Sequence, residues 1–421
     1  MTSNTAHGEA FVWVWLPGQT QPVVAGRLAA DTRGTLQFNY GRSYLERLHD
    51  AAPVISLYEP ELPLRTGALP LLNGLSMPGC LRDSAPDAWG RRVILNKLMG
   101  RPGRDADTAA VDELSYLLES GSDRIGALDY QRSPSEYIPR SVSNVPLEEL
   151  LDSAERVERG IPLTPELDHA LFHGSSIGGA RPKALIEDAG RKYIAKFSSS
   201  SDLFNVIKAE FVAMRLASLA GLQVAPVSLK RAAGKDVLLI ERFDRVASAE
   251  GWTRRIMVSA LTLFGLDEMM ARYASYETFA EIIRHRFEQP KATLRELFSR
   301  LVFNILCGNT DDHARNHAAF WNGHSLQLTP AYDICPQNRS GNEATQAMLI
   351  SGNNRLSTLQ SCREAAHHFL LSTAEAEAIM AAQRECVERH WDAVCDEAAM
   401  SEIERRALWR RQILNPFGVG E

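Results

Sequence analysis

The 421-residue sequence has few features of a secreted or membrane protein. Its six cysteines are scattered and no two have C-x-x-C spacing, which argues against a disulfide framework and against a zinc site. Residues 1–10 contain neither the basic stretch nor the apolar run of a secretory signal. No apolar run approaches the ~20 residues that a membrane-spanning helix needs. We therefore expect a cytoplasmic protein with reduced thiols and no membrane partner.

An excess of positive charge is also missing. The net charge of -6 gives no support for broad binding to nucleic acid through phosphate neutralisation. Hydrophobic residues make up 45% of the sequence and charged residues 23%, the balance of a soluble globular protein. A chain of this length has room for two or three domains with ample core.

Strand signals dominate the first part of the chain, and helical periodicity dominates the last. Aromatic and β-branched residues predict strands at 11–15, 23–28, 35–38, 227–229 and 237–240, and a hairpin at 183–197 that turns at Ala189-Gly190. Apolar periodicity and flanking glycines predict helices at about 86–99, 147–159, 204–219 and 297–306. Polar residues and prolines make 131–146 the best linker candidate. After Asp244 the strand signals thin out, so we expect a β-rich, then mixed, then helical chain.

The segment 308–316, which reads GNTDDHARN, carries the most specific pattern in the sequence. Four residues separate Asp311 from Asn316, and a further acid, Asp333, follows a short predicted hairpin. Protein kinases space their working groups in the same way: one Asp orients the attacking hydroxyl, an Asn five positions later binds magnesium, and a later Asp binds magnesium too. Asp311 has this spacing and Asp312 does not, so Asp311 is the candidate catalytic base.

The hairpin explains how the two magnesium ligands meet. Asn322-Gly323 suits a tight type I′ turn, which returns the chain close to its start. Asn316 and Asp333 can then face one metal ion, and oxygen ligands of this kind suit magnesium held between protein and phosphates. His313 either supports the loop by hydrogen bonding or contacts phosphate, and taken alone it favours the structural interpretation.

A second candidate region lies upstream, in a Ser/Gly-rich stretch and the hairpin after it. Glycines let a backbone approach phosphate oxygens closely. The loop residues expected to contact a nucleotide are Gly178, Gly179, Ala180, Arg181 and Lys183. Lys196 lies in an apolar strand, as does the kinase Lys that binds the α- and β-phosphates, and Glu210 in the next helix is its natural partner. Taken singly, the loop also fits an ordinary linker and Lys196 an edge-strand lysine that points to solvent.

The β-rich part ends at residues 240–244, which read IERFD. In a two-lobed nucleotide enzyme, the chain that crosses between the lobes offers backbone groups to an adenine edge. Glu241 and Phe243 are candidates for this contact by position only. A strand end with a surface salt bridge explains the same residues equally well.

With these motifs in place, the chain resembles the HipA family, bacterial Ser/Thr kinases that act as toxins in toxin–antitoxin modules. The resemblance is carried by the first strands and helix, by 121–128, by the phosphate loop at 176–183, by the Lys strand at 194–197, by ERFDR at 241–245, and by 310–316 and 331–333. The phosphate loop departs from the family pattern, because Arg181-Pro182-Lys183 stands where Gln-x-Lys is usual. Nothing in the chain resembles a DNA-binding helix-turn-helix.

The resemblance implies an α+β, two-lobed protein-kinase-like fold. Its parts would be a HipA N-terminal β-rich subdomain at 1–140, a nucleotide-binding part like a kinase N-lobe at 141–245, and a mainly helical catalytic C-lobe at 246–421. The implied activity is transfer of the γ-phosphoryl group of ATP, with Mg²⁺, to a protein Ser or Thr. The motif around Asp333 adds Tyr332 to the nucleotide site.

Regulation and partners are implied by the same resemblance. Family members phosphorylate a Ser of their own phosphate loop, and here Ser176 aligns best, with Ser175 a second candidate. An aminoacyl-tRNA synthetase is the first candidate substrate. A small helix-turn-helix antitoxin similar to HipB is the expected partner, and it would supply any contact with DNA.

Two other function classes stay open at this point. Five residues could instead form a metal-dependent hydrolase centre: Asp311, Asp312, His313, His317 and Asp333. That interpretation leaves the Gly loop, Lys196 and Glu210 unexplained. The third reading is a catalytically silent kinase-like scaffold that binds an antitoxin or DNA, although no catalytic position is degraded.

Overall fold

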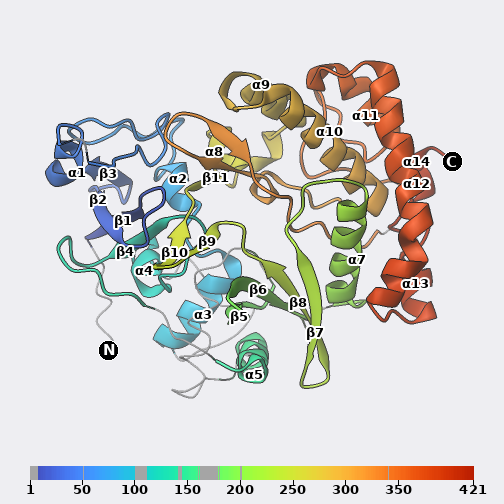
Figure 1. Cartoon of the computed structure of the whole chain (residues 1–421), viewed down its shortest axis with the longest axis horizontal. Coiled ribbons are helices and arrows are strands. Elements are labelled where there is room, and N and C mark those ends of the chain that lie inside the picture. The colour runs from blue at the N-terminus through green and yellow to red at the C-terminus, as the bar shows by residue number, and fades with distance from the viewer. Residues whose placement is uncertain are drawn as a thin grey trace. The chain divides into compact units, whose positions relative to one another are not determined.

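The structure, a computed structural model, describes residues 8–50, 52–99, 111–140, 145–159, 161, 179, 181–199, 202–339 and 341–421. The chain divides into two compact units, whose elements are labelled in Figure 1. The first unit comprises Met1–Ser201, Arg231–Val258 and Trp321–His324, and the second comprises Asp202–Lys230, Ser259–Phe320 and Ser325–Glu421. The three-part division at 140 and 245 stays a prediction.

A four-stranded antiparallel sheet begins the first unit. Its strands are β1 (Glu9–Trp15), β2 (Pro22–Ala30), β3 (Leu36–Tyr40) and β4 (Leu128–Gln131), in the order β3-β2-β1-β4. Val12 and Val14 in β1 are fully buried, as alternate positions of a strand with one core face should be. The helices that accompany this sheet in the chain are α1 (Arg42–Glu46), α2 (Gly79–Arg82), α3 (Ala88–Met99) and α4 (Glu113–Glu119).

The second sheet has the order β5-β6-β8-β7 and contains the predicted hairpin. Its strands are β5 (Lys183–Asp188), β6 (Arg191–Phe197), β7 (Val227–Ala232) and β8 (Lys235–Glu241). Helix α5 (Leu147–Arg159) carries an apolar stripe that includes Leu150, Ala154 and Val157. This stripe joins Ala184 of β5 and other strand residues in one buried cluster, which fixes the back of the hairpin.

A further hairpin follows the point where strand signals were expected to fade. It consists of β9 (Arg245–Ser248) and β10 (Gly251–Arg254), paired antiparallel. Its sequence, RVASAEGWTR, lacks the alternation of apolar and polar residues that marks a strand. The alternation is missing because most side chains of this hairpin are exposed or half-exposed to solvent and contribute little to a hydrophobic core. The expectation that strands thin out after Asp244 was therefore wrong for these residues.

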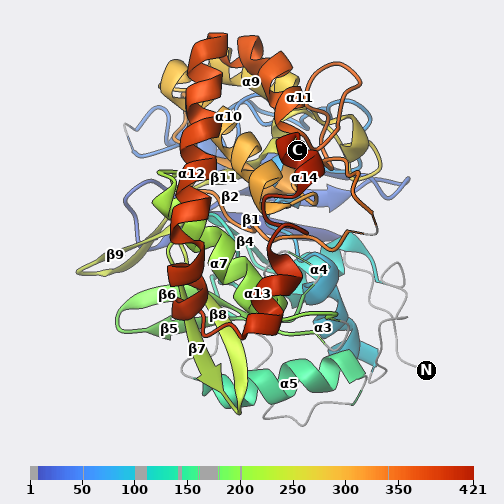
Figure 2. The same ribbon diagram turned by 90° about the vertical axis from the view of Figure 1, so that its right-hand side faces the viewer.

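The second unit is mainly helical. Its elements are α7 (Val206–Leu219), α8 (Ala260–Leu263), a 3-10 turn η3 (Ala271–Tyr273), α9 (Tyr276–Arg286), α10 (Pro290–Cys307), η4 (Ala314–Asn316), α11 (Leu359–Ala365), η5 (Ala366–Phe369), α12 (Thr373–Glu397), α13 (Glu402–Leu408) and α14 (Pro416–Val419). Three short strands complete the description: β11 (Met257–Ser259), β12 (Ala318–Trp321) and β13 (Leu326–Leu328). The long helix α12 runs along α7 and α10 (Figure 2). The β-rich first part and helical last part confirm the expected fold class.

No helix within the ranges given above is long and apolar enough to cross a membrane.

Replacing Gly308 with Ala is expected to destabilise the second unit. Gly308 ends α10 with a left-handed φ of 74°, which costs a residue with a Cβ about 1–2 kcal/mol. A Cβ at this position would also overlap the backbone carbonyl of Gln412. The matched control is Gly221→Ala, because Gly221 has φ 85° but open space around its Cβ position. Thermal unfolding should show a larger fall in Tm for Gly308→Ala, and equal falls would contradict the overlap.

Candidate active site

The predicted catalytic loop starts where α10 ends, and it folds around one carbonyl group. The backbone oxygen of Asp311 accepts hydrogen bonds from the His313 backbone N–H (2.8 Å) and from Nδ2 of Asn316 (3.1 Å). The two bonds close the five-residue spacing that the sequence shows. The amide nitrogen of Asn316 donates to the loop backbone, so its amide oxygen can act as a metal ligand. Magnesium prefers oxygen ligands of this kind.

Asp333 follows the hairpin that β12 and β13 form in the chain. The hairpin is closed by the Thr329 N–H, which donates to the Ala318 carbonyl (3.0 Å). Ala331 is then held by backbone hydrogen bonds to Gln223 (2.8 Å) and Ala225 (2.9 Å). These bonds fix the chain just before Asp333, so its position is set by the fold and not by a mobile loop end.

The backbone of Asp333 adopts a left-handed conformation with φ 60°. Residues with a Cβ enter this region at a cost, and such residues cluster at functional sites. The neighbouring Tyr332 hydroxyl donates to the carbonyl of Arg315 (2.8 Å), which ties the Asp333 segment to the catalytic loop. The second unit therefore brings Asp311, Asn316 and Asp333 into one region, as the sequence predicts.

The electrostatics of Asp311 support the same grouping. Partial loss of water raises the pKa of the Asp311 carboxyl, and the nearby carboxylates of Asp333 and Asp312 raise it further, although His313 acts in the opposite direction. Asp333 is therefore close enough to repel the charge of Asp311. A divalent cation at this place would relieve the repulsion, since an opposite charge favours the ionised carboxylates.

Asp312 belongs to a buried cluster that the sequence interpretation missed. Its carboxylate accepts a hydrogen bond from the Tyr276 hydroxyl, and Nε2 of His317 lies 2.9 Å from it. Burial alone would raise the pKa of Asp312, but His317 and Tyr276 outweigh burial and lower it. Asp312 is thus committed to structure, which supports the choice of Asp311 as the base. Tyr276 lies 36 positions away, so no local pattern could have found this cluster.

The cluster also weakens the hydrolase alternative. That alternative needs Asp312 and His317 to face a metal together with Asp311, whereas the two side chains pair with each other in the interior. Within the described ranges, no group of three or more His, Cys, Asp or Glu side chains is placed to hold a metal ion. The oxygen donors of Asn316 and Asp333 fit the kinase-like arrangement, in which phosphates complete the coordination.

The first unit holds the predicted phosphate-binding lysines. Lys183 of β5 pairs directly with Lys196 of β6, so their side chains share one face of the hairpin. Both side chains are nearly buried, with 4% and 6% of their surface exposed. Two ammonium groups at one rung of a sheet suit a ligand with several negative charges.

Gly179 of the predicted phosphate loop lies beside Lys183. Its backbone N–H donates to the carboxylate of Asp87, and its carbonyl accepts from the backbone N–H of Trp89 (3.1 Å). The residue has φ 106°, and a Cβ there would overlap the ammonium group of Lys183. The backbone conformation therefore favours glycine at this position, whereas the flexible end of Lys183 can move away from a Cβ. The two hydrogen bonds anchor Gly179 at the start of α3.

Other predicted residues of this region are described only in part. Ser175, Ser176, Gly178 and Ala180 lie outside the described residues. Arg181 is half-buried. Lys196 belongs to the first unit and Glu210, which is buried in α7, to the second, so their pairing stays a prediction.

The segment that follows β8 is fixed by a buried ion network. The carboxylate of Asp244 accepts hydrogen bonds from Arg242 (2.9 and 2.8 Å), Arg245 (2.8 Å) and the Gly126 N–H (2.8 Å). Burial by itself would raise the pKa of Asp244, but the two guanidinium groups lower it to about 2. Asp123 takes a second set of contacts from the same two arginines. The ERFDR motif is thus clamped to the 121–128 element.

This clamp places the two candidates for the adenine contact. Glu241 ends β8 and forms an ion pair with Arg191 (2.9 Å), while Phe243 is half-buried between the clamped residues Arg242 and Asp244. The salt bridge at the strand end that the sequence left open is therefore present. A role for Glu241 and Phe243 in nucleotide binding remains a prediction.

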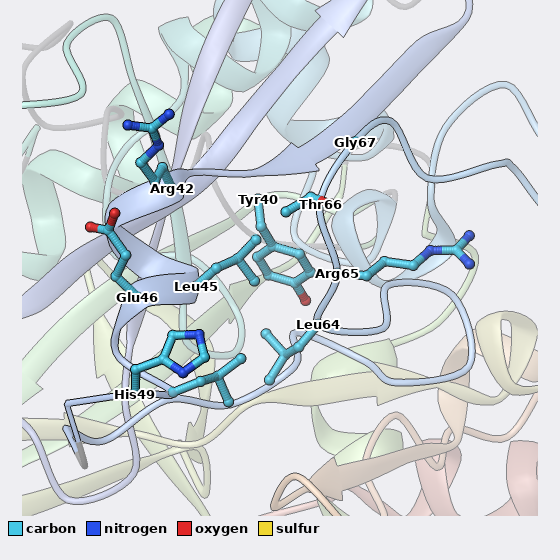
Figure 3. A pocket seen from close by; sticks show the side chains of 10 residues that line it. Tyr40, Arg42, Leu45, Glu46, His49, Leu64, Arg65, Thr66 and Gly67 are labelled. Carbon is cyan, nitrogen blue, oxygen red and sulfur yellow. The ribbon is translucent and has the colours of Figure 1, made fainter.

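A pocket of the first unit lies apart from every predicted site residue. It is formed by α1 with the residues around it and by residues 64–67. Figure 3 shows Tyr40 near its centre, with the charged ends of Arg42 and Arg65 pointing away from it. The pocket contains none of the candidate catalytic or nucleotide-binding groups, so it contributes nothing to the proposed chemistry.

Comparison with known families agrees with the motifs. The HipA-like C-terminal domain matches residues 175–391, and the HipA N-terminal domain matches residues 14–131. A Sinorhizobium fredii protein, Y4mE, whose name marks it provisionally as a kinase, is 26% identical over 347 residues, which are 76% of each chain. The Shewanella oneidensis serine/threonine-protein kinase toxin HipA is 25% identical over 186 residues, 38% of this chain and 42% of that protein.

A solved structure gives the same answer for the fold. The Shewanella oneidensis HipA chain, from a complex with HipB and operator DNA, matches with a TM-score of 0.68 and covers 95% of this chain and 96% of that one. Its sequence identity of 19% shows a common fold and no more. More than half of the chain is matched by the C-terminal domain alone, and the N-terminal domain precedes it in order. The chain therefore belongs to the HipA-like family, whose matched relatives bear kinase names.

Proposed function

We propose that this protein is an ATP- and magnesium-dependent Ser/Thr protein kinase. The proposal rests on one observation above all, the convergence of Asp311, Asn316 and Asp333 on a single region of the second unit. Their spacing and their loop geometry suit phosphoryl transfer, in which positioning and charge stabilisation supply most of the rate gain.

Each group has a definite task in this proposal. Asn316 and Asp333 hold Mg²⁺ through oxygen atoms, and the ion neutralises charge on the transferring phosphoryl group. Lys183, Lys196 and the loop at 178–181 bind the phosphates of ATP. Asp311 accepts the proton of the attacking hydroxyl, a task for a carboxylate that lies beside the magnesium ligands.

The proposed nucleotide site has a further set of contacts. His313 and Tyr332 lie on the two segments that carry the proposed magnesium ligands, Glu241 is the last residue of β8, and Phe243 lies two residues beyond it. The test of the proposal is transfer of labelled phosphate from γ-labelled ATP by the purified chain. Hydrolysis of a phosphodiester without ATP would instead favour the metal-dependent hydrolase.

A silent scaffold is the second candidate, favoured by the setting of the related structure. The Shewanella oneidensis HipA was solved with HipB and operator DNA, and by analogy we propose a small helix-turn-helix antitoxin as partner here, with DNA contacted only through it. A scaffold need not bind nucleotide, so the affinity for ATP in the presence of magnesium separates the two candidates.

We further propose a cytoplasmic location and an aminoacyl-tRNA synthetase as the first substrate to test.

Incubation with ATP is expected to phosphorylate Ser176, or else Ser175. A phosphoserine beside the triphosphate site would add a charge of about -1.5 to -2 and repel ATP, so the modified enzyme should lose activity. Phosphopeptide mapping checks the site, and Ser176→Ala with Ser175→Ala should keep the enzyme active for longer. Mapping that finds neither serine modified in an active preparation would count against this regulation.

A further inference from the structure

Four large apolar side chains of the second unit are unusually exposed near the catalytic loop. Met269 is 80% exposed, Met270 43%, Tyr273 53% and Leu356 47%. The guanidinium group of Arg272 lies 5.0 Å from the ring centre of Tyr273. A single exposed apolar side chain is ordinary, but several on linked segments are typical of an interaction surface.

An ion pair joins this group to the catalytic loop. Nη1 of Arg315 lies 3.1 Å from the carboxylate of Glu268, the residue before Met269. Arg315 belongs to the 3-10 turn η4, which ends at Asn316. The exposed methionines therefore begin one residue from a direct contact with the proposed catalytic machinery.

A second chain segment, which includes Ala347, Arg355 and Leu356, contacts both the methionine segment and the catalytic loop. Nη2 of Arg355 donates to the carbonyl of Arg272 (3.0 Å), which sets the segment of Leu356 against the segment of the methionines. The same strand-like region reaches the loop, because the Ala347 N–H donates to the carbonyl of Thr310 (3.1 Å). This second segment thus borders Thr310, the residue that precedes the candidate base, whereas the methionine segment borders Arg315.

The two acidic side chains of this region, Asp267 and Glu268, are held by local contacts. The carboxylate of Asp267 accepts the backbone N–H of Met270 (2.8 Å), and that of Glu268 is paired with the catalytic loop. Glu268 is exposed, but its charge is paired with Arg315. Arg272 is exposed and Arg355 half-buried, and neither guanidinium forms an ion pair with a carboxylate of the described residues, so the surface offers positive charge beside apolar side chains.

We propose that the side chains of Met269, Met270, Arg272, Tyr273, Arg355 and Leu356 form a docking surface for the protein substrate. The substrate segment would carry apolar and acidic residues beside the Ser or Thr that receives the phosphate. Unbranched methionines adapt to different partners, which suits a surface that binds an extended peptide. The inference rests on the proposed kinase function and deepens it, because it names the chemistry of the substrate.

The test compares two Ser peptides that differ only in charge, one with Leu and Glu around the Ser and one with Leu and Lys. The wild-type enzyme should favour the Glu peptide in kcat/KM, on the order of fivefold for exposed charge pairs. Arg272→Glu should remove or reverse this preference. Met269→Lys should raise KM for the Lys peptide with kcat little changed, since it removes apolar binding shared by ground state and transition state and adds a positive charge that repels this peptide.

Ile403→Lys is the matched control. Ile403 lies on α13 and is 81% exposed, so the substitution changes surface charge and hydrophobicity to the same extent without touching the docking surface. Its kinetics should equal those of the wild type. Equal kcat/KM for the two peptides in the wild type, or an unchanged preference in Arg272→Glu, would overturn the inference.

Two further readouts separate the ways in which the inference can fail. ATP consumption and labelling of the chain are measured in the same reactions. Absence of both would refute the kinase function and the docking surface with it, whereas ATP consumption without any peptide preference would refute the docking surface alone. Gel filtration of Met269→Lys tests whether the surface instead binds a second copy of the chain. A change of oligomeric state with unaltered peptide kinetics would assign the surface to that second copy.

Discussion

Replacing Asp311 with Asn is expected to lower the rate of phosphoryl transfer by about 10²–10⁴-fold, the usual contribution of a general base. Asn keeps the shape of the side chain and its place on the loop, because the bonds that hold the loop are made by the backbone carbonyl of residue 311. The measurement is incorporation of labelled phosphate from γ-labelled ATP by the purified variant. Robust incorporation at the wild-type rate would refute the role of Asp311.

The stability of this variant provides a second readout. The pKa of Asp311 is raised, which means that the folded chain disfavours its ionised form. Removing the charge should therefore leave Tm unchanged or slightly higher at neutral pH. A lost activity that accompanies a strongly reduced Tm would point to misfolding instead of lost chemistry.

Asp333→Asn is the variant that distinguishes the base from the metal ligands. It removes charge from the proposed magnesium site but keeps an oxygen donor, so higher magnesium concentrations should restore part of the activity. No magnesium concentration should restore Asp311→Asn. If magnesium rescued both variants equally, the separate roles assigned to the two acids would be wrong.

Replacing Asp244 with Asn is expected to destabilise the first unit by about 3–5 kcal/mol, the cost of breaking a buried ion pair from one side. The substitution removes one of the two carboxylates that bridge the buried side chains of Arg242 and Arg245, and it leaves Asp123 to face both positive charges. Thermal unfolding checks the loss. The matched control is Asp152→Asn, which breaks an exposed pair with Arg156 and should cost about 0–1 kcal/mol.

The pH dependence of this difference follows from the lowered pKa of Asp244. A carboxyl whose folded pKa is about 2 contributes stability that is fully present above its unfolded pKa of 3.8 and is lost as pH falls toward 2. The gap in Tm between wild type and Asp244→Asn should therefore be constant near neutrality and shrink between about pH 4 and pH 2. A gap that stays constant through this window would show that the carboxylate charge is not what stabilises the fold.

The predicted elements with strong local signals agree with the structure. The helix at 147–159, the hairpin at 183–197 and the end of α10 at Gly308 depend on periodicity, a turn and a left-handed glycine, all of which lie within the segment itself. The β9–β10 hairpin was missed because exposed strands bury too little to impose an alternating pattern.

Clusters of distant residues could not be found in this way. Tyr276 and Asp312 are 36 positions apart, and Asp123 and Arg242 are 119 apart. Both contacts give a buried charged group hydrogen bonds in place of those that it loses with water. Which partners are present depends on which segments of the chain pack together. The structure thus assigns Asp312 and Asp244 to the scaffold, a role that their motifs alone do not reveal.

By itself, the sequence determined which residues make up the candidate site, because the spacing of Asp311, Asn316 and Asp333 is a property of one loop and one hairpin. Only the tertiary structure decided which carboxylates of this region are committed to the interior. It buried Asp312 against Tyr276 and His317 while leaving Asp311 exposed beside Asp333. The physical reason is that a carboxylate stays charged in the interior only where the fold supplies donors for it, and those donors come from segments far away in the chain.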